Sequence, residues 1–360
     1  MSSFENPQND IVEKYHRQII KKIMILLVCI IGIVLSFGLL SVSTFDVISL
    51  SQSYEIIFNH LKGTTYPSRS VEWWADRYIW EAAIPRGLAA IIAGSSLAVA
   101  GSLMQSLMNN PLADPYSTGI SSGACFGAVS AIIMGVSFSA FASEYGLVVN
   151  AFIGSLVPAL IIIVISKKIQ MTPATLILIG TALSYFFNSM VTYMMVTADV
   201  ESLQSAYMWQ IGTLGNISWE SLPTMFMMSL IGIIFTLFMS RQLNILALGD
   251  NSAKTLGLDV ESFRTLCLTI IALMTAAIIA FTGIIGFVGL VAPHIIRMII
   301  GSDNRFVVPI SMAVGAFLLI VADYIAVSVG TPVGLIMSVI GSPIFLILII
   351  WQRKGYGAIY

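Results

Sequence analysis

The stretch GIIGFVGLVAPHIIRMIIGSDNRFVVPISMAVGAFLLIVAD, from Gly283 to Asp323, carries the strongest structural signal in the chain. Two apolar runs, at about 285–300 and 306–326, flank a short polar turn. A helix needs about 20 mainly apolar residues to cross the hydrocarbon core of a membrane, and bundles tolerate helices broken by Pro or Gly. The stretch therefore predicts two consecutive membrane crossings, the first of them short and interrupted by Pro293 and Arg297.

Similar apolar runs fill the chain on both sides of this stretch. Of the 360 residues, 57% are hydrophobic and 10% are charged, whereas soluble globular chains carry about 25% charged residues. We therefore predict an all-α integral membrane protein with about ten spanning helices in a single membrane domain. The predicted spans are 23–42, 87–107, 117–136, 147–166, 173–196, 222–240, 265–282, 285–300, 306–326 and 332–351.

The distribution of lysine and arginine predicts the orientation, because these residues gather in cytoplasmic loops. With ten spans both termini lie on one side, and placing them inside leaves only four of the 17 basic residues outside: Lys62, Arg69, Arg77 and Arg86. We expect a multi-pass protein of the cytoplasmic membrane. Its segments are a cytoplasmic N-terminal segment 1–22, a membrane domain 23–351 that includes a polar cytoplasmic segment 241–264, and a cytoplasmic tail 352–360.

The longest polar connection, from Ser43 to Pro85, is expected outside. Its aromatic side chains suit a membrane interface, and Ser51–Leu61 is expected to form a short helix on the surface. These aromatic residues are Tyr54, Tyr66, Trp73, Trp74, Tyr78 and Trp80.

Small residues recur at helical spacing inside the predicted spans. Gly119, Gly123 and Gly127 share one helix face, and Gly94 and Gly101 lie seven residues apart. Small side chains let helix backbones approach closely in lipid, so these positions predict tight helix packing.

Residues for catalysis or metal binding are scarce. The dipeptide Gly-Lys never occurs, which excludes a G-x-x-x-x-G-K-[ST] phosphate-binding loop. The three histidines and three cysteines show no zinc-binding or C-x-x-C spacing. The net charge of −1 gives no indication of nucleic-acid binding. We expect no catalytic residue, no metal site and no bound cofactor on this chain.

Few ionisable residues fall at membrane depth, where such groups usually mark function. Asp323 is either an ion or proton site or a carboxylate bonded to a neighbouring helix end or to polar side chains. We favour the second interpretation, because proton-coupled carriers contain more buried ionisable groups. Pro293 leaves a backbone carbonyl unpaired, and we expect His294 to satisfy such groups rather than to bind a ligand.

Residues 241–264 (RQLNILALGDNSAKTLGLDVESFR) are too polar to span, yet they contain several leucines. We predict two short helices with a turn at Leu248–Asn251, a positive φ at Gly249, and a helix cap within Asp250–Ser252. An exposed apolar face on the cytoplasmic side predicts a protein partner. The alternative is a helix that lies against lipid, but the segment has few basic residues to attract lipid headgroups.

A series of motifs resembles the FecCD-type permeases, which are the membrane subunits of bacterial and archaeal ABC importers for iron chelates and cobalamin. The resemblance runs in order from about Ile84 to the C-terminus. The motifs are IPR at 84–86, GSLMQSLMNNPLADPYSTGISSGACFGA at 101–128, WQIGTL at 209–214, LNILALGDNSAKTLGL at 243–258, the stretch quoted first, and TPVGLIMSVIGSPIFLILI at 331–349. Structural motif positions within them are Asn110, Pro111, Gly119, Gly123, Pro293, His294 and Asp323.

The resemblance implies a type II ABC importer permease bundle that works as a homodimer with its pore between the subunits. It implies two cytoplasmic ATP-binding subunits, which hold ATP and Mg, and an extracytoplasmic substrate-binding protein. It places an inner gate at Thr172, Pro173 and Ala174. It also places the ATPase contact in the segment 241–264, at Leu246, Leu248, Gly249, Asp250, Ala253, Leu256 and Gly257.

The chain departs from the family at charged positions on the outer side. Family members often have R-x-P-R where this chain has Ala83 to Arg86, and an arginine where it has Val327. We therefore expect Arg86 to be the main cationic anchor for the binding protein, with Arg77 as the second.

We expect a metal chelate as the cargo, with a ferric siderophore first, and cobalamin, haem and molybdate-type anions remain open. Two other function classes remain at this point. An ion-coupled secondary transporter would work without an ATPase. It would need buried titratable groups for ion coupling, and this sequence offers mainly Asp323. An intramembrane enzyme would need a nucleophile and base in one cavity, and one histidine at membrane depth gives little support for it.

Overall fold

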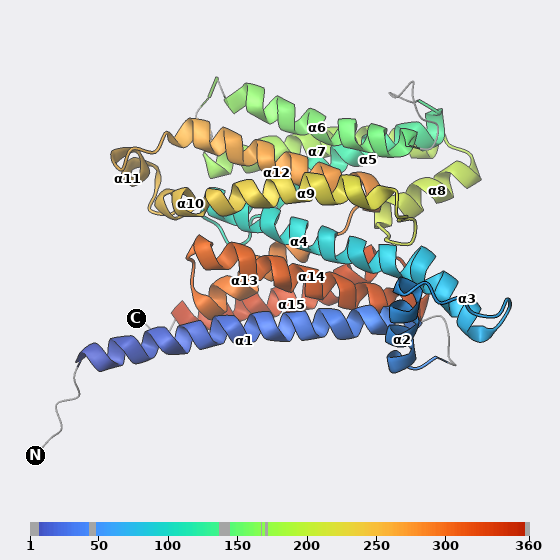
Figure 1. The fold of residues 1–360 in the computed structure, drawn as a ribbon. Coiled ribbons are helices and arrows are strands. Elements are labelled where there is room, and N and C mark those ends of the chain that lie inside the picture. The colour runs from blue at the N-terminus through green and yellow to red at the C-terminus, as the bar shows by residue number, and fades with distance from the viewer. Residues whose placement is uncertain (1–6, 43–47, 137–144, 167, 170–171, 357–360) are drawn as a thin grey trace, which may run out of the picture.

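The computed structural model describes residues 7–356 apart from 43–47, 137–144, 167 and 170–171. In this part of the chain all regular elements are helices, and most run along one common axis (Figure 1). Eight are long and apolar enough to cross a membrane, and α5 and α13 are shorter apolar helices. Each predicted span coincides with one of these ten helices, which confirms the predicted fold. The outermost residues of the predicted segments 1–22 and 352–360 lie outside the described residues.

The helices of the bundle and those at its ends have the following bounds. The bundle contains α1 (Pro7–Val42), α4 (Ile84–Leu107), α5 (Ile120–Met134), α6 (Gly146–Ser166), α7 (Pro173–Val196), α9 (Ser221–Phe238), α12 (Val260–Thr282), α13 (Val288–Ile300), α14 (Asn304–Val329) and α15 (Val333–Tyr356). The shorter elements are α2 (Leu50–Leu61), α3 (Val71–Tyr78), the π-helical turn η1 (Ile79–Ala83), the 3-10 turn η2 (Pro115–Thr118), α8 (Val200–Ile211), α10 (Ser240–Leu246) and α11 (Asp250–Thr255). Figure 1 shows α10 and α11 at one end of the bundle and α2, α3 and α8 at the other. These are called the α10–α11 end and the α2–α3 end.

Helix α4 runs through the middle of the bundle (Figure 1). In the most apolar 18-residue stretch of the helical run that contains it, 83% of the residues are buried. Its glycines explain how other helices come so close. A side chain at Gly101 would collide with the backbone of Gly289 in α13, and one at Gly94 would collide with the backbone of Gly315 in α14. The predicted close packing at these two glycines is confirmed.

Helices α5 and α6 pack in the same way. Gly123 lies against Gly154, and Gly127 lies against the backbone of Asn150. Gly119 precedes α5 with a φ of 84°, a conformation that glycine adopts without steric cost. In the preceding turn, the side-chain oxygen of Asn110 accepts a hydrogen bond of 2.9 Å from the backbone N–H of Leu112.

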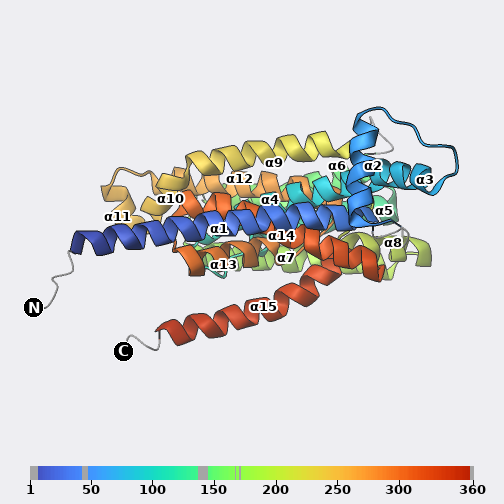
Figure 2. The ribbon, with the colours of Figure 1, turned by 60° about the horizontal axis from the view of Figure 1, so that its bottom comes forward.

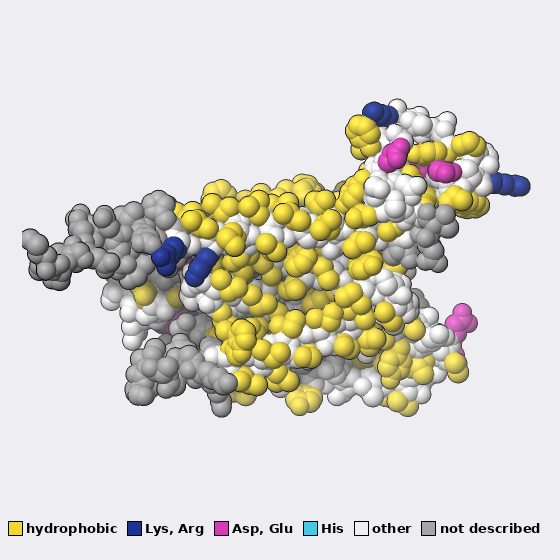
Figure 3. Space-filling model, turned by 90° about the horizontal axis from the view of Figure 1, so that it is seen from below, with side chains coloured by type: hydrophobic (Ala, Val, Ile, Leu, Met, Phe, Trp, Pro, Cys, Tyr) yellow, Lys and Arg dark blue, Asp and Glu magenta, His cyan; other side chains and the backbone are white. Residues whose placement is uncertain are grey.

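The outside of the bundle is largely apolar. Figure 3 shows hydrophobic side chains across the face in view, with lysine and arginine only near its two ends. Helix α15 lies at the edge, where only 28% of its apolar window is buried, and Figure 2 shows its C-terminal half apart from the other helices.

The polar connection after α1 folds into α2 and α3. Ser49 caps α2, and its side chain and Gln52 form a reciprocal capping box, so the predicted surface helix at Ser51–Leu61 is present. From Val71 to Leu107, α3, η1 and α4 form one helical run of 37 residues. The segment from Asp76 to Arg86 is therefore helical.

Candidate functional site

The start of α7, where the inner gate was predicted, has a well-defined helix cap. The Thr172 hydroxyl accepts a hydrogen bond of 3.2 Å from the N–H of Thr175, and Pro173 occupies the first turn. Proline suits this position because its missing N–H would be unpaired there in any case. Ala174 is exposed, so a second chain can approach the helix closely at this point.

One face of α7 exposes polar and aromatic side chains at membrane depth. Tyr185 and Tyr193 are 72% and 66% exposed, and Thr181, Asn188 and Thr192 are also exposed. The Thr192 hydroxyl bonds to the backbone of its own helix, but a side-chain amide in contact with lipid tails would lack partners. This face of α7 therefore requires water or another protein chain beside it.

The segment between α9 and α12 forms two short helices, α10 and α11, as predicted. Gly249 joins them with a φ of 92°, which confirms the expected positive φ. Leu248 and Leu256 are 62% and 60% exposed, so both offer apolar surface at the α10–α11 end. Gly257 follows α11 and also has a positive φ.

Three predicted contact residues in this segment have other roles. Leu246 is 3% exposed and Ala253 is fully buried. Both pack into the bundle core, so they support the segment from within and have no surface to offer a partner. The Asp250 carboxylate does not cap α11, because the cap residue is Gly249. It pairs instead with Arg264 of α12, at 3.0 Å between Oδ1 and Nη2.

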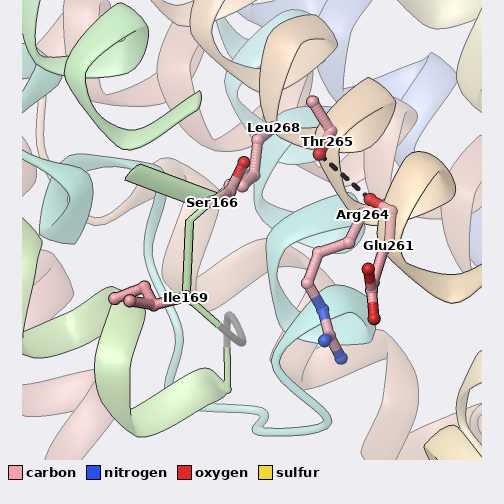
Figure 4. Close-up of a pocket in the computed structure, with 6 residues that line it drawn as sticks. All are labelled: Ser166, Ile169, Glu261, Arg264, Thr265 and Leu268. Atoms are coloured by element: carbon pink, nitrogen blue, oxygen red, sulfur yellow. Dashed lines mark hydrogen bonds between the residues drawn. The ribbon is translucent and has the colours of Figure 1, made fainter. Parts of the chain in front are cut away.

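Arg264 also borders a small cavity at the start of α12. Figure 4 shows its side chain beside Glu261, with Ser166, Ile169, Thr265 and Leu268 around the same space. The volume is about 20 Å³, which is enough for roughly one water molecule. This cavity is far too small for a chelate, so we exclude it as a cargo site.

A buried polar network ties α13 to α4 near the α10–α11 end. The Arg297 guanidinium donates to the Ser106 hydroxyl at 2.7 Å, to the backbone carbonyl of Ser102 and to the side chain of Gln105. The amide of Gln105 in turn donates to the backbone carbonyl of Leu290 at 3.1 Å. The charge of Arg297 is thus solvated by protein groups, as a buried charge must be.

The same network reaches α10. Arg297 donates to the side-chain oxygen of Asn304 at 3.0 Å, and Asn304 donates to the side-chain oxygen of Asn244 in α10 through both its backbone and side-chain N–H groups. Asn244 then donates to Asp303 at 2.7 Å. Hydrogen bonds from the Arg305 side chain lower the pKa of Asp303 to about 2. One chain of hydrogen bonds therefore joins α10, α14, α13 and α4.

Comparison with known proteins agrees with this architecture. The model of the FecCD transport family matches residues 24–351, which is most of the chain. The chain belongs to the FecCD transport family. The motifs from Ile84 onward therefore identified the family correctly, and the relatives of this chain are permease subunits of ABC importers.

Two curated relatives and one solved structure illustrate the similarity of this FecCD-family chain. It is 36% identical over 282 residues to the hemin transport system permease protein HmuU of Yersinia pestis, a match that covers 77% of this chain and 84% of HmuU. It is 36% identical over 282 residues to the vitamin B12 import system permease protein BtuC of Vibrio cholerae, covering 76% and 83%. An inward-facing structure of a metal-chelate type ABC transporter superposes with a TM-score of 0.76 at 28% identity, and the match covers 91% of this chain and 98% of that chain.

Arg86 and Asp323 form a buried ion pair in this FecCD-family chain. The Nε and Nη2 atoms of Arg86 each donate to one Asp323 oxygen at 2.8 Å. The Asp323 side chain is fully buried, and that of Arg86 is 20% exposed. The structural interpretation of Asp323 is supported, because its partner is a polar side chain, the guanidinium of Arg86. The expectation that Arg86 is the main docking cation is corrected, because its guanidinium neutralises a buried carboxylate.

Arg77, the second predicted docking cation, is exposed at the α2–α3 end. It pairs with Glu81 one turn later, at 3.0 Å, and both side chains are more than half exposed. Its guanidinium also lies 5.7 Å from the centroid of the Trp73 ring. An exposed pair of this kind contributes little stability, so Arg77 is free to exchange Glu81 for another carboxylate.

His294 lies buried in α13. Its ring is 1% exposed and packs edge-on against Phe345 at 6.4 Å. Within the described part of the chain, neither ring nitrogen has a hydrogen-bond partner. The backbone of Pro111 faces the ring, no bond to a carbonyl freed by Pro293 is seen in the described part of the chain, and the ring packs between α13 and α15.

The sequence interpretation missed α8 and the depth of the connection between α4 and α5. Helix α8 packs on α5, where Ala206 is fully buried beside Val129. Tyr116 in η2 donates a hydrogen bond of 2.8 Å to the backbone of Ile285. The Asn-Pro and Asp-Pro pairs at 110–111 and 114–115 signal a turn, but they do not reveal that it packs into the bundle.

Proposed function

We propose that this chain is the membrane-spanning permease subunit of an ABC importer for a metal chelate. Two copies would assemble with their α7 helices facing each other across the pathway. ATP would be hydrolysed on separate partner subunits, with ATP and Mg held there. The proposal combines the family membership with the exposed surfaces of this chain.

The polar face of α7 is the observation that carries the proposal. Pro173–Val196 contains no Asp, Glu, Lys, Arg or His, yet its exposed face holds hydroxyl, amide and phenol groups. A wall of neutral polar and aromatic groups solvates a passing chelate weakly and attracts neither sign of charge strongly. Such a wall suits the release of a large cargo, because binding that is too strong would prevent exit.

The α10–α11 end is proposed as the cytoplasmic side. Thirteen of the 17 basic residues then lie inside, in agreement with the positive-inside rule. The exposed Leu248 and Leu256 would enter an apolar groove on the ATPase, and Arg264 would hold α11 in position through Asp250. Cysteines placed at Ser68 and Asn251 should react with impermeant reagents from opposite sides, and reaction from the same side would reject this orientation.

The α2–α3 end is proposed as the docking surface for an extracytoplasmic binding protein. Arg77 is an exposed cation there, as are Lys62 and Arg69, and Arg86 would contribute only indirectly by stabilising the start of α4. We infer a ferric chelate as the first candidate cargo. HmuU and BtuC act on hemin and vitamin B12, so haem and cobalamin are the alternatives.

The test is reconstitution in liposomes with the partner ATPase and the binding protein. ATP-dependent uptake of a ferric siderophore, hemin or cobalamin is expected for one of the three. A cysteine at Ala174 is expected to cross-link to its twin in at least one nucleotide state. A cysteine at Leu178, which is 71% exposed one turn later, serves as the matched position. Uptake driven by an ion gradient without ATP would support the secondary-transporter alternative and overturn the proposal.

A further inference from the structure

Helix α2 has three chemically different faces. Ser53 and Ile56 are buried, and Ile56 packs with Ala75 and Ile79 of the following helical run. Ser51 and Glu55 lie on an exposed polar face. The third face is apolar and consists of Leu50, Tyr54, Ile57, Phe58 and Leu61, whose spacing places them along one side of a helix.

We call this third face the apolar face of α2. Its N-terminal part packs against α1. Leu50 and Tyr54 lie against Gly38, where a side chain would collide with both, and the Tyr54 hydroxyl donates a hydrogen bond to the backbone carbonyl of Val34. Val34 and Gly38 belong to the apolar span Ile19–Val42. Helix α2 therefore meets α1 between one and two turns inside the end of its apolar span.

Among the described residues, no helix covers the C-terminal part of the same face. Phe58 is 57% exposed and Leu61 is 68% exposed. Figures 1 and 2 show α2 running across the axis of α1, and Figure 3 shows the α2–α3 end extending past the side of the bundle with hydrophobic side chains on it. Because α2 runs across the axis of α1 (Figures 1 and 2), Phe58 and Leu61 lie at about the same membrane depth as the contact between Tyr54 and α1.

We propose that α2 is a membrane-interface helix, with Phe58 and Leu61 inserted into the leaflet at the α2–α3 end. Lipid is the occupant that the depth favours, because Val34 and Leu35 of α1 are themselves half exposed at the same level. The Lys62 ammonium lies 4.2 Å from the centroid of the Phe58 ring. From there it can reach the phosphate layer while its stem covers apolar surface.

This anchor fixes the height of α3 relative to the bilayer. The His60 ring on α2 bonds to Asp76 of α3 at 2.8 Å and stacks on Trp80 at 4.1 Å. A lipid-held α2 therefore holds α3, including the exposed Arg77, near the membrane surface.

Spin-label accessibility tests the proposal. Phe58→Cys and Leu61→Cys variants are labelled with a nitroxide and reconstituted in phosphatidylethanolamine–phosphatidylglycerol liposomes without any binding protein. Glu55→Cys, on the polar face of the same helix, is the matched control. The native cysteines Cys29, Cys125 and Cys267 are buried, so labelling is directed to the introduced thiol. Collision rates are measured with oxygen, which concentrates in lipid, and with a water-soluble nickel chelate.

The expected ratio of oxygen to nickel accessibility is several-fold higher at positions 58 and 61 than at position 55. Equal, water-like ratios at all three positions would overturn the proposal. If positions 58 and 61 become shielded only when a binding protein is added, the face is a protein interface and the lipid proposal is also overturned. The measurement requires neither ATP nor cargo, so its outcome is independent of the proposed transport function.

Discussion

Helices α1 and α7 provide a controlled comparison within one chain. Each contributes a candidate span of 24 residues, and in each only 22% of the apolar window is buried. The exposed side chains of α1 are aliphatic, including Ile23, Leu27 and Ile31, whereas those of α7 include Asn188 and Thr192. Equal exposure in a single subunit thus has two chemical meanings: the aliphatic side chains of α1 suit lipid, whereas the amide and hydroxyl groups of α7 require water or another protein chain beside them.

The largest effect that would break this comparison comes from one lysine placed on each helix. Val28 of α1 is 61% exposed near the middle of its span, and a lysine there costs about 3 kcal/mol in lipid. Val28→Lys is expected to reduce the amount of inserted protein strongly. Ser189→Lys on α7 is expected to insert normally but to impair chelate uptake. Equal loss of inserted protein for both variants, measured in membrane fractions, would show that α7 also faces lipid.

The second prediction concerns what the two helices are fixed to. Helix α1 packs on α14 through Cys29 and Val314. Helix α14 is tied to α10 through Asn304 and Asn244 and to α13 through Arg297. If these connected helices move as a unit relative to α7 during transport, Arg297→Gln should leave ATP hydrolysis intact while chelate uptake falls. The buried acceptors that lose their donor should lower the free energy of unfolding by about 1–3 kcal/mol. Arg305→Gln, at the exposed start of α14, is the control. A parallel loss of hydrolysis and uptake would indicate a purely structural role.

A third, smaller effect sharpens the comparison through water access. Thiols react as thiolates, which form in water and not in lipid. A cysteine at Tyr185 in α7 is expected to react about tenfold faster with an impermeant maleimide than one at Leu27 in α1, a difference of about 1.4 kcal/mol. The comparison is made in the assembled transporter with its ATPase. Similar slow rates at both positions would mean that α7 is sealed by lipid or by its partner.

The smallest expected effect is a dependence of stability on pH. Asp303 has a pKa of about 2 in the folded chain because of its bonds to Arg305, below the usual value of about 3.9. Its contribution is present above pH 4 and is lost as the pH falls towards 2, and for an exposed pair it amounts to about 1 kcal/mol or less. Thermal unfolding should therefore show a small acid-dependent decrease that Asp303→Asn removes. Pro173–Val196 has no acidic, basic or histidine side chain, so α7 should add no such term.

The sequence predicted the ten spans because lipid imposes a simple length and composition on each. It also predicted the two short helices and the positive φ of Gly249. It failed where the answer depends on contacts between distant segments. Arg86 and Asp323 are 237 residues apart, so each looked like an isolated charge. Ala253 and Leu248 are both apolar, and only the fold decides which of them is buried and which is exposed.

The difference between α1 and α7 could be predicted only in part from the sequence. The polar residues of α7 were visible in the sequence, but a helix with a few hydroxyl groups is also compatible with a buried position. Only the exposed fractions of Tyr185 and Tyr193 distinguish an exposed helix face from a packed interior. Family resemblance placed the gate at Thr172, Pro173 and Ala174, and that assignment stays a prediction.

The unbroken helix from Val71 to Leu107 has a mechanical consequence. Its 37 residues correspond to a rod of about 55 Å, whereas the hydrocarbon core is only about 30 Å thick. Nearly half of the rod therefore extends past the core, and the tight backbone contacts at Gly94 and Gly101 hold the rest. A displacement of α3, which α2 holds through His60 and Asp76, would therefore be transmitted along one helical run to these backbone contacts inside the membrane.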